Sequence, residues 1–394
     1  MKVLFIMNGS FCNHTTSEHL LTGILNALIH EGHKVHVIQM LKKGDKLQLP
    51  DSLSGANITT EAVYTTPQKR KNFIARYLNA NLNYIKCKGA LKQNSGCDAV
   101  FLQSTNAAGM AVWMVRRYLK KACITYNVQD IFPYNAMYAG MIKKKSLLFL
   151  LLAKIQRYGY KHSDHIITIS EDMKKTLVED GISPDKIHVI YNWSYQDNTY
   201  ESIDISSVSH LFNKNFFNVV YAGNIGVMQN VDVIIECANL LKNERDIWFY
   251  IIGDGIYKEK LLIKAKEYKI SNISFEPMQP PALAPAIYRS ADLNVIPLAR
   301  NIYKTALPSK IATCLACQTP IVFAIGKNSL YGRLIQKGTC CQVIEPDDPQ
   351  MLAQAILTAK NTPKQPETLE FFIAHCSRNK NSLQYAKIIC SQAQ

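Results

Sequence analysis

"KVLFIMNG" (residues 2–9) contains five consecutive apolar residues, Val3 to Met7, and ends at the turn-forming pair Asn8-Gly9. An apolar run of this length bounded by turn residues is typical of a strand whose two faces are both buried. A helical stripe of apolar residues follows over 17–31, and a second apolar run covers 33–40. Strand, helix and strand in this order predict a parallel βαβ unit.

The same alternation continues along the first half and begins again in the second. Further strands of the first half are predicted at 98–104, 122–128, 164–170 and 186–192. In the second half, strands are predicted at 217–224, 247–255, 272–277, 293–299, 319–325 and 341–346, and helices at 230–242, 257–268, 281–290, 328–337 and 348–360. The sequence therefore predicts an α/β protein of two doubly wound, Rossmann-like domains, with ligands bound in a cleft at the carboxyl ends of the strands.

A polar stretch, residues 194–214, interrupts the alternation and separates the two halves. We expect a first domain over 1–195, a linker over 196–214 and a second domain over 215–375. The remaining residues, 376–394, have a helical pattern, and the sequence leaves open whether this tail returns to the first domain.

Length and composition agree with a globular protein of two cores. The 394 residues are 47% hydrophobic, and a chain of this length exceeds what one core usually holds. The longest apolar run, Leu147 to Ala153, is far shorter than the roughly 20 residues of a spanning helix. The apolar residues at 3–7 are too few for a signal peptide, and the 11 cysteines show no disulfide-like spacing. We expect a cytoplasmic protein, dissolved or peripheral on the inner membrane.

The net charge of +15 is concentrated in the first half, where residues 1–165 contain 22 basic and 8 acidic side chains. The basic clusters are not interleaved with aromatic residues, so we do not expect a nucleic-acid partner. "KKKSLLFLLLAKIQRYGYK" (143–161) joins basic flanks to a very apolar segment. This pattern favours either an anionic membrane surface as partner or a core helix with solvated basic ends, and the two remain open.

"TALPSKIATCLACQTPIV" (305–322) places a lysine where a loop gives way to an apolar helix. Pro308 suits a first helical turn, because its missing N–H would be unpaired there. Ser309 and Lys310 would then present a hydroxyl and a positive charge at the positive end of the helix dipole, which attracts phosphate. A solvated lysine at a helix start is the alternative.

Glycine-rich turns follow two predicted strands of the second half, "GNIG" (223–226) and "GDG" (253–255). Glycine lets the backbone approach a ligand and offers N–H donors to phosphate oxygens, although each turn alone is a weak signal. Neither a G-x-G-x-x-G fingerprint nor a P-loop is present, which argues against a dehydrogenase or a P-loop enzyme.

Two loops of the first half contain residues that we expect at a ligand site. Asn8, Gly9 and His19 belong to the loop that follows the first strand. Asp130 lies in "YNVQDIFPYNAMYAG" (126–140), after a central strand. Its carboxylate would orient a sugar hydroxyl or accept a proton, whereas a helix cap or a turn is the alternative role.

Cys314 and Cys317 have the spacing of a metal or redox pair. They lie on the apolar stripe of a predicted helix, and no second pair at zinc-site spacing accompanies them. We therefore expect buried structural cysteines and no metal site.

Taken together, these motifs resemble a family 4 glycosyltransferase of GT-B fold. The nearest group is that of the bacterial fucosaminyltransferases, which build surface polysaccharides. The resemblance spans nearly the whole chain and rests on the order of several stretches rather than on one. They are "SEHLLTGILNALIHEGHKVHVI", "VQDIFPYNAMYAG", "DHIITISEDMKKTLVEDGISPDKIHVIYNW", "VVYAGNIGVMQNVDVIIECANLL", "FYIIGDG", "ALPSK" and "VIEPDDPQMLAQAI".

The resemblance implies a sugar nucleotide, UDP-linked in our expectation, held mainly by the second domain and an acceptor met by the first. It puts Lys310 and Ser309 beside the phosphates of the donor, with Asn224 and the backbone of Gly226 in the same pocket. We expect Gly253 and Asp254 to line that pocket and Gly9 to close over the phosphates. Transfer with retention of anomeric configuration and without a metal is implied as well.

The sequence also departs from the family pattern. Thr305 and Thr313 stand where the family has two glutamates, the first for sugar hydroxyls and the second for the ribose. A threonine hydroxyl cannot offer the two oxygens of a carboxylate. The basic residue that usually follows the GNIG-like turn is absent, with 227–229 reading Val-Met-Gln, and Gln129 stands beside Asp130 in place of histidine or arginine.

The sequence therefore predicts a glycosyltransferase that moves a hexose or amino sugar to a lipid-linked or saccharide acceptor in capsule, O-antigen or exopolysaccharide synthesis. Lys310 and Asp130 are the expected catalytic residues. Partners would include an anionic membrane surface and other polysaccharide-assembly enzymes. Two alternatives remain open: a catalytically impaired paralogue that acts as an interaction partner, and a nucleotide-sugar epimerase.

Overall fold

A computed structural model describes residues 1–13, 18–53, 57–66, 73–194, 203–362 and 368–391. The chain divides into two compact units. Unit 1 comprises Met1–Tyr191 and Arg378–Gln394, and unit 2 comprises Asn192–Ser377. The chain thus passes between the units twice, at 191–192 and at 377–378.

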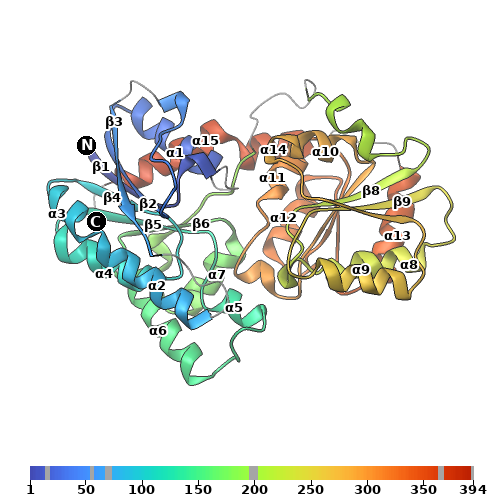
Figure 1. Ribbon diagram of the computed structural model, residues 1–394, viewed down its shortest axis with the longest axis horizontal. Helices are drawn as coiled ribbons and strands as arrows, with labels where there is room; N and C mark the ends of the chain where they lie inside the picture. Colours follow the sequence, from blue (N-terminus) through green and yellow to red (C-terminus); the bar gives the residue numbers. More distant parts are fainter. Residues whose placement is uncertain (14–17, 54–56, 67–72, 195–202, 363–367, 392–394) are drawn as a thin grey trace. The chain divides into compact units, whose positions relative to one another are not determined.

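Unit 1 is built on a seven-stranded parallel sheet with the order β3-β2-β1-β4-β5-β6-β7 (Figure 1). Its strands are β1 (Lys2–Asn8), β2 (Lys34–Leu41), β3 (Ile58–Tyr64), β4 (Ala99–Leu102), β5 (Cys123–Val128), β6 (His165–Thr168) and β7 (Ile187–Val189). Its helices are α1 (Glu18–His30), α2 (Phe73–Lys86), α3 (Lys88–Gln93), α4 (Ala108–Tyr118), α5 (Tyr134–Tyr138), α6 (Leu147–His162), α7 (Glu171–Glu179) and α15 (Arg378–Ile389).

The stretch at 2–9 forms the interior strand β1, with Val3 opposite Val35 of β2 and Ala99 of β4. Val3 to Met7 are all buried, as the uninterrupted apolar run predicts. The last helix, α15, packs against α1, and the Tyr385 hydroxyl donates to Asn127 Oδ1 on β5 at 3.2 Å. The carboxyl end of the chain is therefore part of unit 1.

Unit 2 is built on a six-stranded parallel sheet with the order β10-β9-β8-β11-β12-β13. Its strands are β8 (Phe217–Ala222), β9 (Ile247–Ile252), β10 (Ile273–Glu276), β11 (Leu293–Pro297), β12 (Ile321–Ala324) and β13 (Gln342–Ile344). Its helices are α8 (Asp232–Leu240), α9 (Lys258–Glu267), α10 (Ala284–Ser290), α11 (Lys310–Ala316), α12 (Leu330–Gly338), α13 (Pro349–Lys360) and α14 (Thr368–Cys376).

Helix starts in both units follow signals that the sequence already contains. Ser170 accepts a hydrogen bond from the Met173 amide at 3.1 Å and caps α7. Asp348 accepts from the Met351 amide at 2.8 Å and caps α13, in which Pro349 takes the first position. A polar cap before an apolar stripe satisfies an amide that the helix leaves unpaired, so it fixes where the helix begins.

Two parallel sheets, each with its own order of strands, confirm the predicted α/β fold class. Strand β3 is absent from the strands predicted above. Of its seven residues only Val63 is buried, because β3 is an edge strand, and its sequence ITTEAVY lacks an apolar run. Among the described residues no helix combines the length and the apolar composition needed to cross a membrane.

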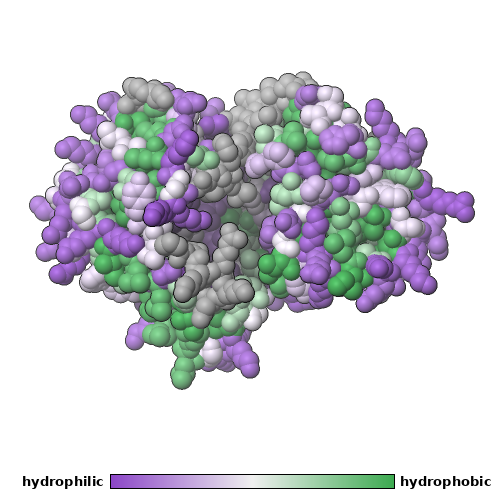
Figure 2. Space-filling view, in the orientation of Figure 1, coloured by the Kyte–Doolittle hydropathy of each residue, from purple (hydrophilic) through white to green (hydrophobic). Residues whose placement is uncertain are grey.

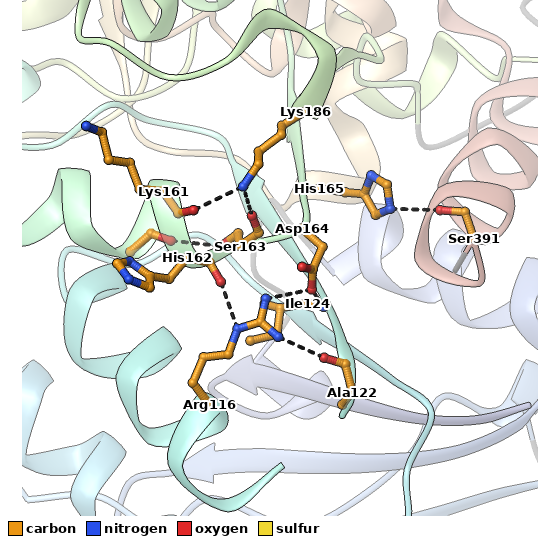
Figure 3. Close-up of polar contacts among 11 residues, drawn as sticks. Arg116, Ala122, Ile124, Lys161, His162, Ser163, Asp164, His165, Lys186 and Ser391 are labelled. Carbon is orange, nitrogen blue, oxygen red and sulfur yellow. Dashed lines mark hydrogen bonds and ion pairs between the residues drawn. The ribbon is translucent and has the colours of Figure 1, made fainter. Parts of the chain in front are cut away.

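Helices α4 and α6 of unit 1 lie in close contact at two glycines. A methyl group built at Gly109 would lie 2.4 Å from the carbonyl oxygen of Ile155, and one at Gly159 would lie 2.7 Å from the backbone of Ala108. Nearby, the Arg116 guanidinium donates to Asp164 at 2.7 Å and to the carbonyls of His162 and Ala122 (Figure 3). These contacts tie α4 and the end of α6 to the sheet.

Substitution of Gly159 by alanine should lower the free energy of unfolding by about 1–3 kcal/mol, because the added methyl meets backbone that cannot rotate away. The measurement is denaturant-induced unfolding. Gly89→Ala in α3 is the matched control, since its methyl would meet nothing within 4 Å. That helical alanine should leave stability unchanged or raise it by roughly 0.5–1 kcal/mol. Equal effects of the two substitutions would contradict close packing of α4 against α6.

Candidate functional site

The side chain of Lys310 lies at the carboxyl edge of the second sheet, above the end of β8. Its ammonium nitrogen is 3.8 Å from the centre of the Tyr221 ring. A methyl group built at Gly223 would lie 2.8 Å from the same nitrogen, so the ammonium occupies space that a side chain at 223 would fill. Lys310 therefore points back over the sheet rather than into solvent.

The Lys310 ammonium is buried and has no hydrogen-bond partner within the part of the chain that the structure describes. An ammonium has three hydrogen-bond donors, and leaving these donors without acceptors in a buried position costs free energy. The face of an aromatic ring compensates only in part. Burial lowers the pKa of Lys310 to about 8, so the group is still mostly protonated at neutral pH. A desolvated, unpaired cation of this kind is the expected partner of an anion.

Two glycine turns form the edge beneath this lysine, and they hold each other. The Gly223 amide donates to the Ile252 carbonyl at 2.9 Å, and the Ile225 amide donates to the Asp254 carbonyl at 2.8 Å. A methyl group at Gly253 would lie 1.9 Å from the Gly223 oxygen, so only glycine fits there. The glycines of 253–255 therefore serve the contact between two loops, and their expected place in the donor pocket stays a prediction.

The turn at 223–226 is shaped by Gln229. Its side-chain oxygen accepts from the Gly226 amide at 3.1 Å and from Asn224 Nδ2 at 3.2 Å. The Gly226 amide is thus already engaged within the turn, whereas the Asn224 side chain is exposed, and the expected place of both in the donor pocket stays a prediction. The Tyr221 hydroxyl donates to the Asn224 carbonyl, which fixes the ring below Lys310. Asp254 is exposed, and its carboxylate accepts from the Gly255 amide at 2.8 Å.

The helix that follows Lys310 differs from the expectation. Helix α11 has only seven residues and starts at Lys310, so Pro308 precedes it and does not lie in its first turn. Ser309 is exposed at the cap position, and its hydroxyl makes no capping bond. A helix this short does not supply the anion site that we expected. The positive charge of the site comes from the Lys310 side chain itself.

The two threonines at the family's glutamate positions have different surroundings. Thr305 is 1% exposed, and its hydroxyl donates to the Ile302 carbonyl at 3.2 Å, so it does not face a ligand in this structure. Thr313 is partly exposed on α11, one turn after Lys310, and accepts from the Ser194 hydroxyl at 3.4 Å. Neither position presents a carboxylate.

Three expected residues of unit 1 lie at the carboxyl edge of its sheet. Gly9 follows β1 with a φ of 92°, and its amide donates to the Met40 carbonyl at 3.0 Å. Asp130 follows β5, two strands away in the sheet, and His19 is the second residue of α1. Asp130 as a whole residue is exposed to solvent, but protein atoms surround its carboxyl group. This partial desolvation raises the pKa of Asp130 to about 6. Such a carboxylate can accept a proton near neutral pH.

Within the described ranges no group of three or more His, Cys, Asp or Glu side chains could hold a metal ion. Cys314 and Cys317 are both buried, and burial raises the pKa of the Cys317 thiol to about 12. A thiol that stays protonated is a poor metal ligand and a poor nucleophile. The cysteine pair is therefore part of the core of unit 2.

Two residues of this site, Tyr221 and Gln229, were not predicted from the sequence. Gln229 left a signal, since a glutamine three residues after a cap position often accepts from the amide of the cap residue, as Gln229 does from Gly226. Tyr221 left none, because an aromatic residue within an apolar strand is typical of a core. Only the position of Lys310 above its ring shows its role.

Two protein-family models match the chain, one to each half. Residues 17–193 match "Glycosyltransferase Family 4", and residues 217–361 match "Glycosyl transferases group 1". WbjE of Pseudomonas aeruginosa, described as a glycosyltransferase, is 26% identical over 58% of this chain and 58% of its own length. WcaI of Escherichia coli K12, described as a colanic acid biosynthesis glycosyl transferase, is 28% identical over 54% of each. The matches thus span little more than half of these curated relatives.

Solved structures share the fold over nearly the whole chain. HepE of Anabaena in complex with UDP-glucose superposes with a TM-score of 0.73 and 15% identity, covering 98% of both chains. WaaG, a glycosyltransferase involved in lipopolysaccharide biosynthesis, superposes with a TM-score of 0.68 and 15% identity, covering 99% of this chain and 100% of its own. At such identities the likeness shows the fold, which is GT-B. Each half of that fold thus matches a family model of glycosyltransferases, the first half that of family 4.

Proposed function

We propose that this protein is a retaining glycosyltransferase that transfers a hexose or an amino sugar from a UDP-sugar to a lipid-linked or saccharide acceptor in surface-polysaccharide biosynthesis. One observation carries the proposal. The buried ammonium of Lys310 has no hydrogen-bond partner among the described residues and lies beside the exposed residues Asn224 and Ser309 at the carboxyl edge of a doubly wound sheet. Ligands of such sheets bind at that edge, and a diphosphate supplies the charge that Lys310 lacks.

The comparisons support the substrate class. HepE was solved with UDP and with UDP-glucose, and WcaI is named for colanic acid biosynthesis. Carried over to this chain, they favour a UDP-linked donor and an acceptor in polysaccharide assembly. Three parts of the proposal rest on the resemblance. They are retention of anomeric configuration, a reaction without a metal and, as in the fucosaminyltransferase group, transfer of an amino sugar. An acceptor on the cytoplasmic face of the inner membrane and contact with other assembly enzymes rest on the resemblance as well.

The proposed reaction breaks the bond between the anomeric carbon and the diphosphate and joins that carbon to an acceptor oxygen. Negative charge grows on the departing diphosphate, and Lys310 stabilises it more strongly than it stabilises the intact donor. The hydroxyl of the acceptor substrate loses its proton, and Asp130 in unit 1 is the candidate general base that takes this proton. Gly9 and His19 lie at the same edge of unit 1, and Gly253, Asp254 and Thr313 belong to the donor side in this proposal.

The burial of Thr305 favours one alternative, an impaired paralogue that keeps the fold and acts through binding. Such a protein would bind a UDP-sugar without forming product from any acceptor. An epimerase would convert the UDP-sugar with no acceptor present. Product analysis with a lipid-pyrophosphate saccharide, with and without acceptor, separates the three functions.

Lys310→Met should weaken UDP binding about 10- to 150-fold, because a charge-assisted hydrogen bond to phosphate is worth about 1.5–3 kcal/mol. Isothermal titration with UDP, after a thermal-shift screen of nucleotide sugars, measures the effect. Lys337→Met on α12 is the control, since Lys337 is exposed. Transfer should fall at least as much as binding. An unchanged affinity of the Lys310 variant would contradict the proposed phosphate contact.

The affinity for UDP should fall as the pH rises above about 8, by up to tenfold per pH unit, because free Lys310 has a lowered pKa of about 8 and binding requires its charge. Titrations between pH 7.5 and 9.5 test this range, in which the phosphates of UDP are already ionised. The affinity of Lys310→Met should not change with pH in this range. A wild-type affinity that is equally flat would exclude Lys310 as the group that titrates.

Lys310→Met should also make the free protein more stable at pH 7, by up to about 3 kcal/mol. The folded pKa lies near 8 and the ordinary value is 10.5, so the unfolded chain binds more protons between these values. Wild-type stability should therefore rise with pH through this window, whereas the stability of the variant should lack this rise. Denaturant unfolding at pH 7 and pH 10 measures both. A destabilised variant at pH 7 would show that Lys310 is structural.

A further inference from the structure

The outer surface formed by α4 and α6 of unit 1 is strongly basic. Residues 108–121 and 141–163 contain ten lysines and arginines and no aspartate or glutamate. Arg116 and Arg157 pair with Asp164 and Asp180 from other elements. The other eight basic side chains make no ion pair with a described residue. This positive charge is therefore available to a partner.

The same surface exposes large apolar side chains at the start of α6. Leu147 is 87% exposed, Leu151 is 56% exposed and Leu150 is 53% exposed. Figure 2 shows apolar side chains gathered over this end of the helix, at the lower tip of unit 1. Met141 and Leu148 are also exposed, and Lys143, Lys144 and Lys145 lie between them in the chain. We call residues 141–151 the apolar tip.

Helix α6 buries one face and leaves another unpartnered. Phe149, Leu152 and Gln156 are buried in unit 1, so this face of α6 belongs to the core, while the membrane partner that the sequence left open concerns the opposite face. The opposite face exposes residues at helical spacing, Leu147, Leu151, Lys154, Tyr158 and Lys161. Apolar and cationic positions thus follow one another along a single exposed stripe.

A pocket of about 470 Å³ opens between the ends of α4 and α6. It is lined by three aromatic and three basic residues, namely Trp113, Tyr118, Tyr158, Arg116, Arg117 and Lys120. The Arg117 guanidinium lies 5.8 Å from the centre of the half-exposed Trp113 ring. Tryptophan and tyrosine beside arginine and lysine are the residues that proteins place at the headgroup level of membranes.

We propose that this surface docks unit 1 on an anionic lipid bilayer, with the apolar tip inserted among the headgroups and the pocket at Trp113 facing lipid phosphates. A bilayer fits this surface because the exposed leucines of the tip are accompanied by lysines and by no acidic residue, which complements anionic headgroups above an apolar interior. Apolar insertion and electrostatic attraction together give stable but reversible membrane binding. The proposal goes beyond the sugar-transfer chemistry and does not depend on it.

Co-sedimentation with two kinds of vesicle tests the proposal, one of phosphatidylcholine alone and one of equal parts phosphatidylcholine and phosphatidylglycerol. The 394-residue protein should sediment with the anionic vesicles at low salt and less so at high salt. It should stay in the supernatant when the vesicles are neutral. Binding to neither kind would overturn the proposal. Equal binding to both would overturn its electrostatic part.

Lys143, Lys144 and Lys145 changed together to glutamate should lower the affinity for anionic vesicles tenfold or more. The matched control changes Lys242, Lys266 and Lys269 of unit 2 to glutamate, three exposed lysines with the same change in net charge. The control also matches the backbone, since Lys145 and Lys269 both have a positive φ. Equal losses in the two triple variants would show that binding follows net charge and not this surface.

Leu150 and Leu151 changed together to asparagine should weaken binding even at low salt, because insertion is lost while the charge remains. Leu262→Asn with Ile263→Asn on α9 is the control, since these two residues are 42% and 53% exposed. Cooperative denaturant unfolding of all four variants, with the midpoint of the wild type, is the folding control and keeps this test separate from the proposed catalysis. Unchanged vesicle binding by the Leu150 and Leu151 variant would contradict insertion of the tip.

Discussion

The unpaired ammonium of Lys310 on the face of Tyr221 is the contact around which the carboxyl edge of unit 2 is organised. The Tyr221 hydroxyl fixes the turn at Asn224, and glycine at 223 leaves the space that the ammonium occupies. The next turn then packs against the first so closely that Gly253 admits no side chain. A cation held in this way costs stability in the free protein, and such a cost is typical of a binding site.

The close contact of the two glycine turns changes the interpretation of the family motif in this chain. Amides that a phosphate would otherwise use donate instead to protein oxygens, as Gly226 does to Gln229. In the proposed function the anion is recognised mainly through side chains, of which Lys310 has the charge, and Asn224 and Ser309 are exposed. Threonine in place of the two glutamates of the family pattern, at 305 and 313, has the same consequence in that proposal, because fewer groups would hold the sugar and the ribose. Selectivity for the donor would then depend on few contacts.

The two units differ in the surfaces they offer. Unit 2 places its candidate site at the edge of a sheet, where strands end and loops begin, as in other doubly wound proteins. Unit 1 carries most of the basic residues, and its α4 and α6 are pressed together at Gly109 and Gly159. That close contact and the ion pair between Arg116 and Asp164 hold α6, and with it the exposed leucines, in place on unit 1. The two proposed roles, sugar transfer and membrane docking, each use one of these surfaces.

The sequence by itself determined the order of strands and helices, the helix caps at Ser170 and Asp348, and the identity of Lys310 as a candidate, because periodicity and capping are local properties of the chain. It did not reveal the edge strand β3, because the sequence ITTEAVY shows neither an apolar run nor a clear alternation of apolar and polar residues. Tertiary structure alone decided that Lys310 lies unpaired over Tyr221, that Thr305 is buried and that Leu147 is exposed. The reason is that a pattern along one element shows which face is apolar, whereas the neighbour that covers that face comes from distant parts of the chain.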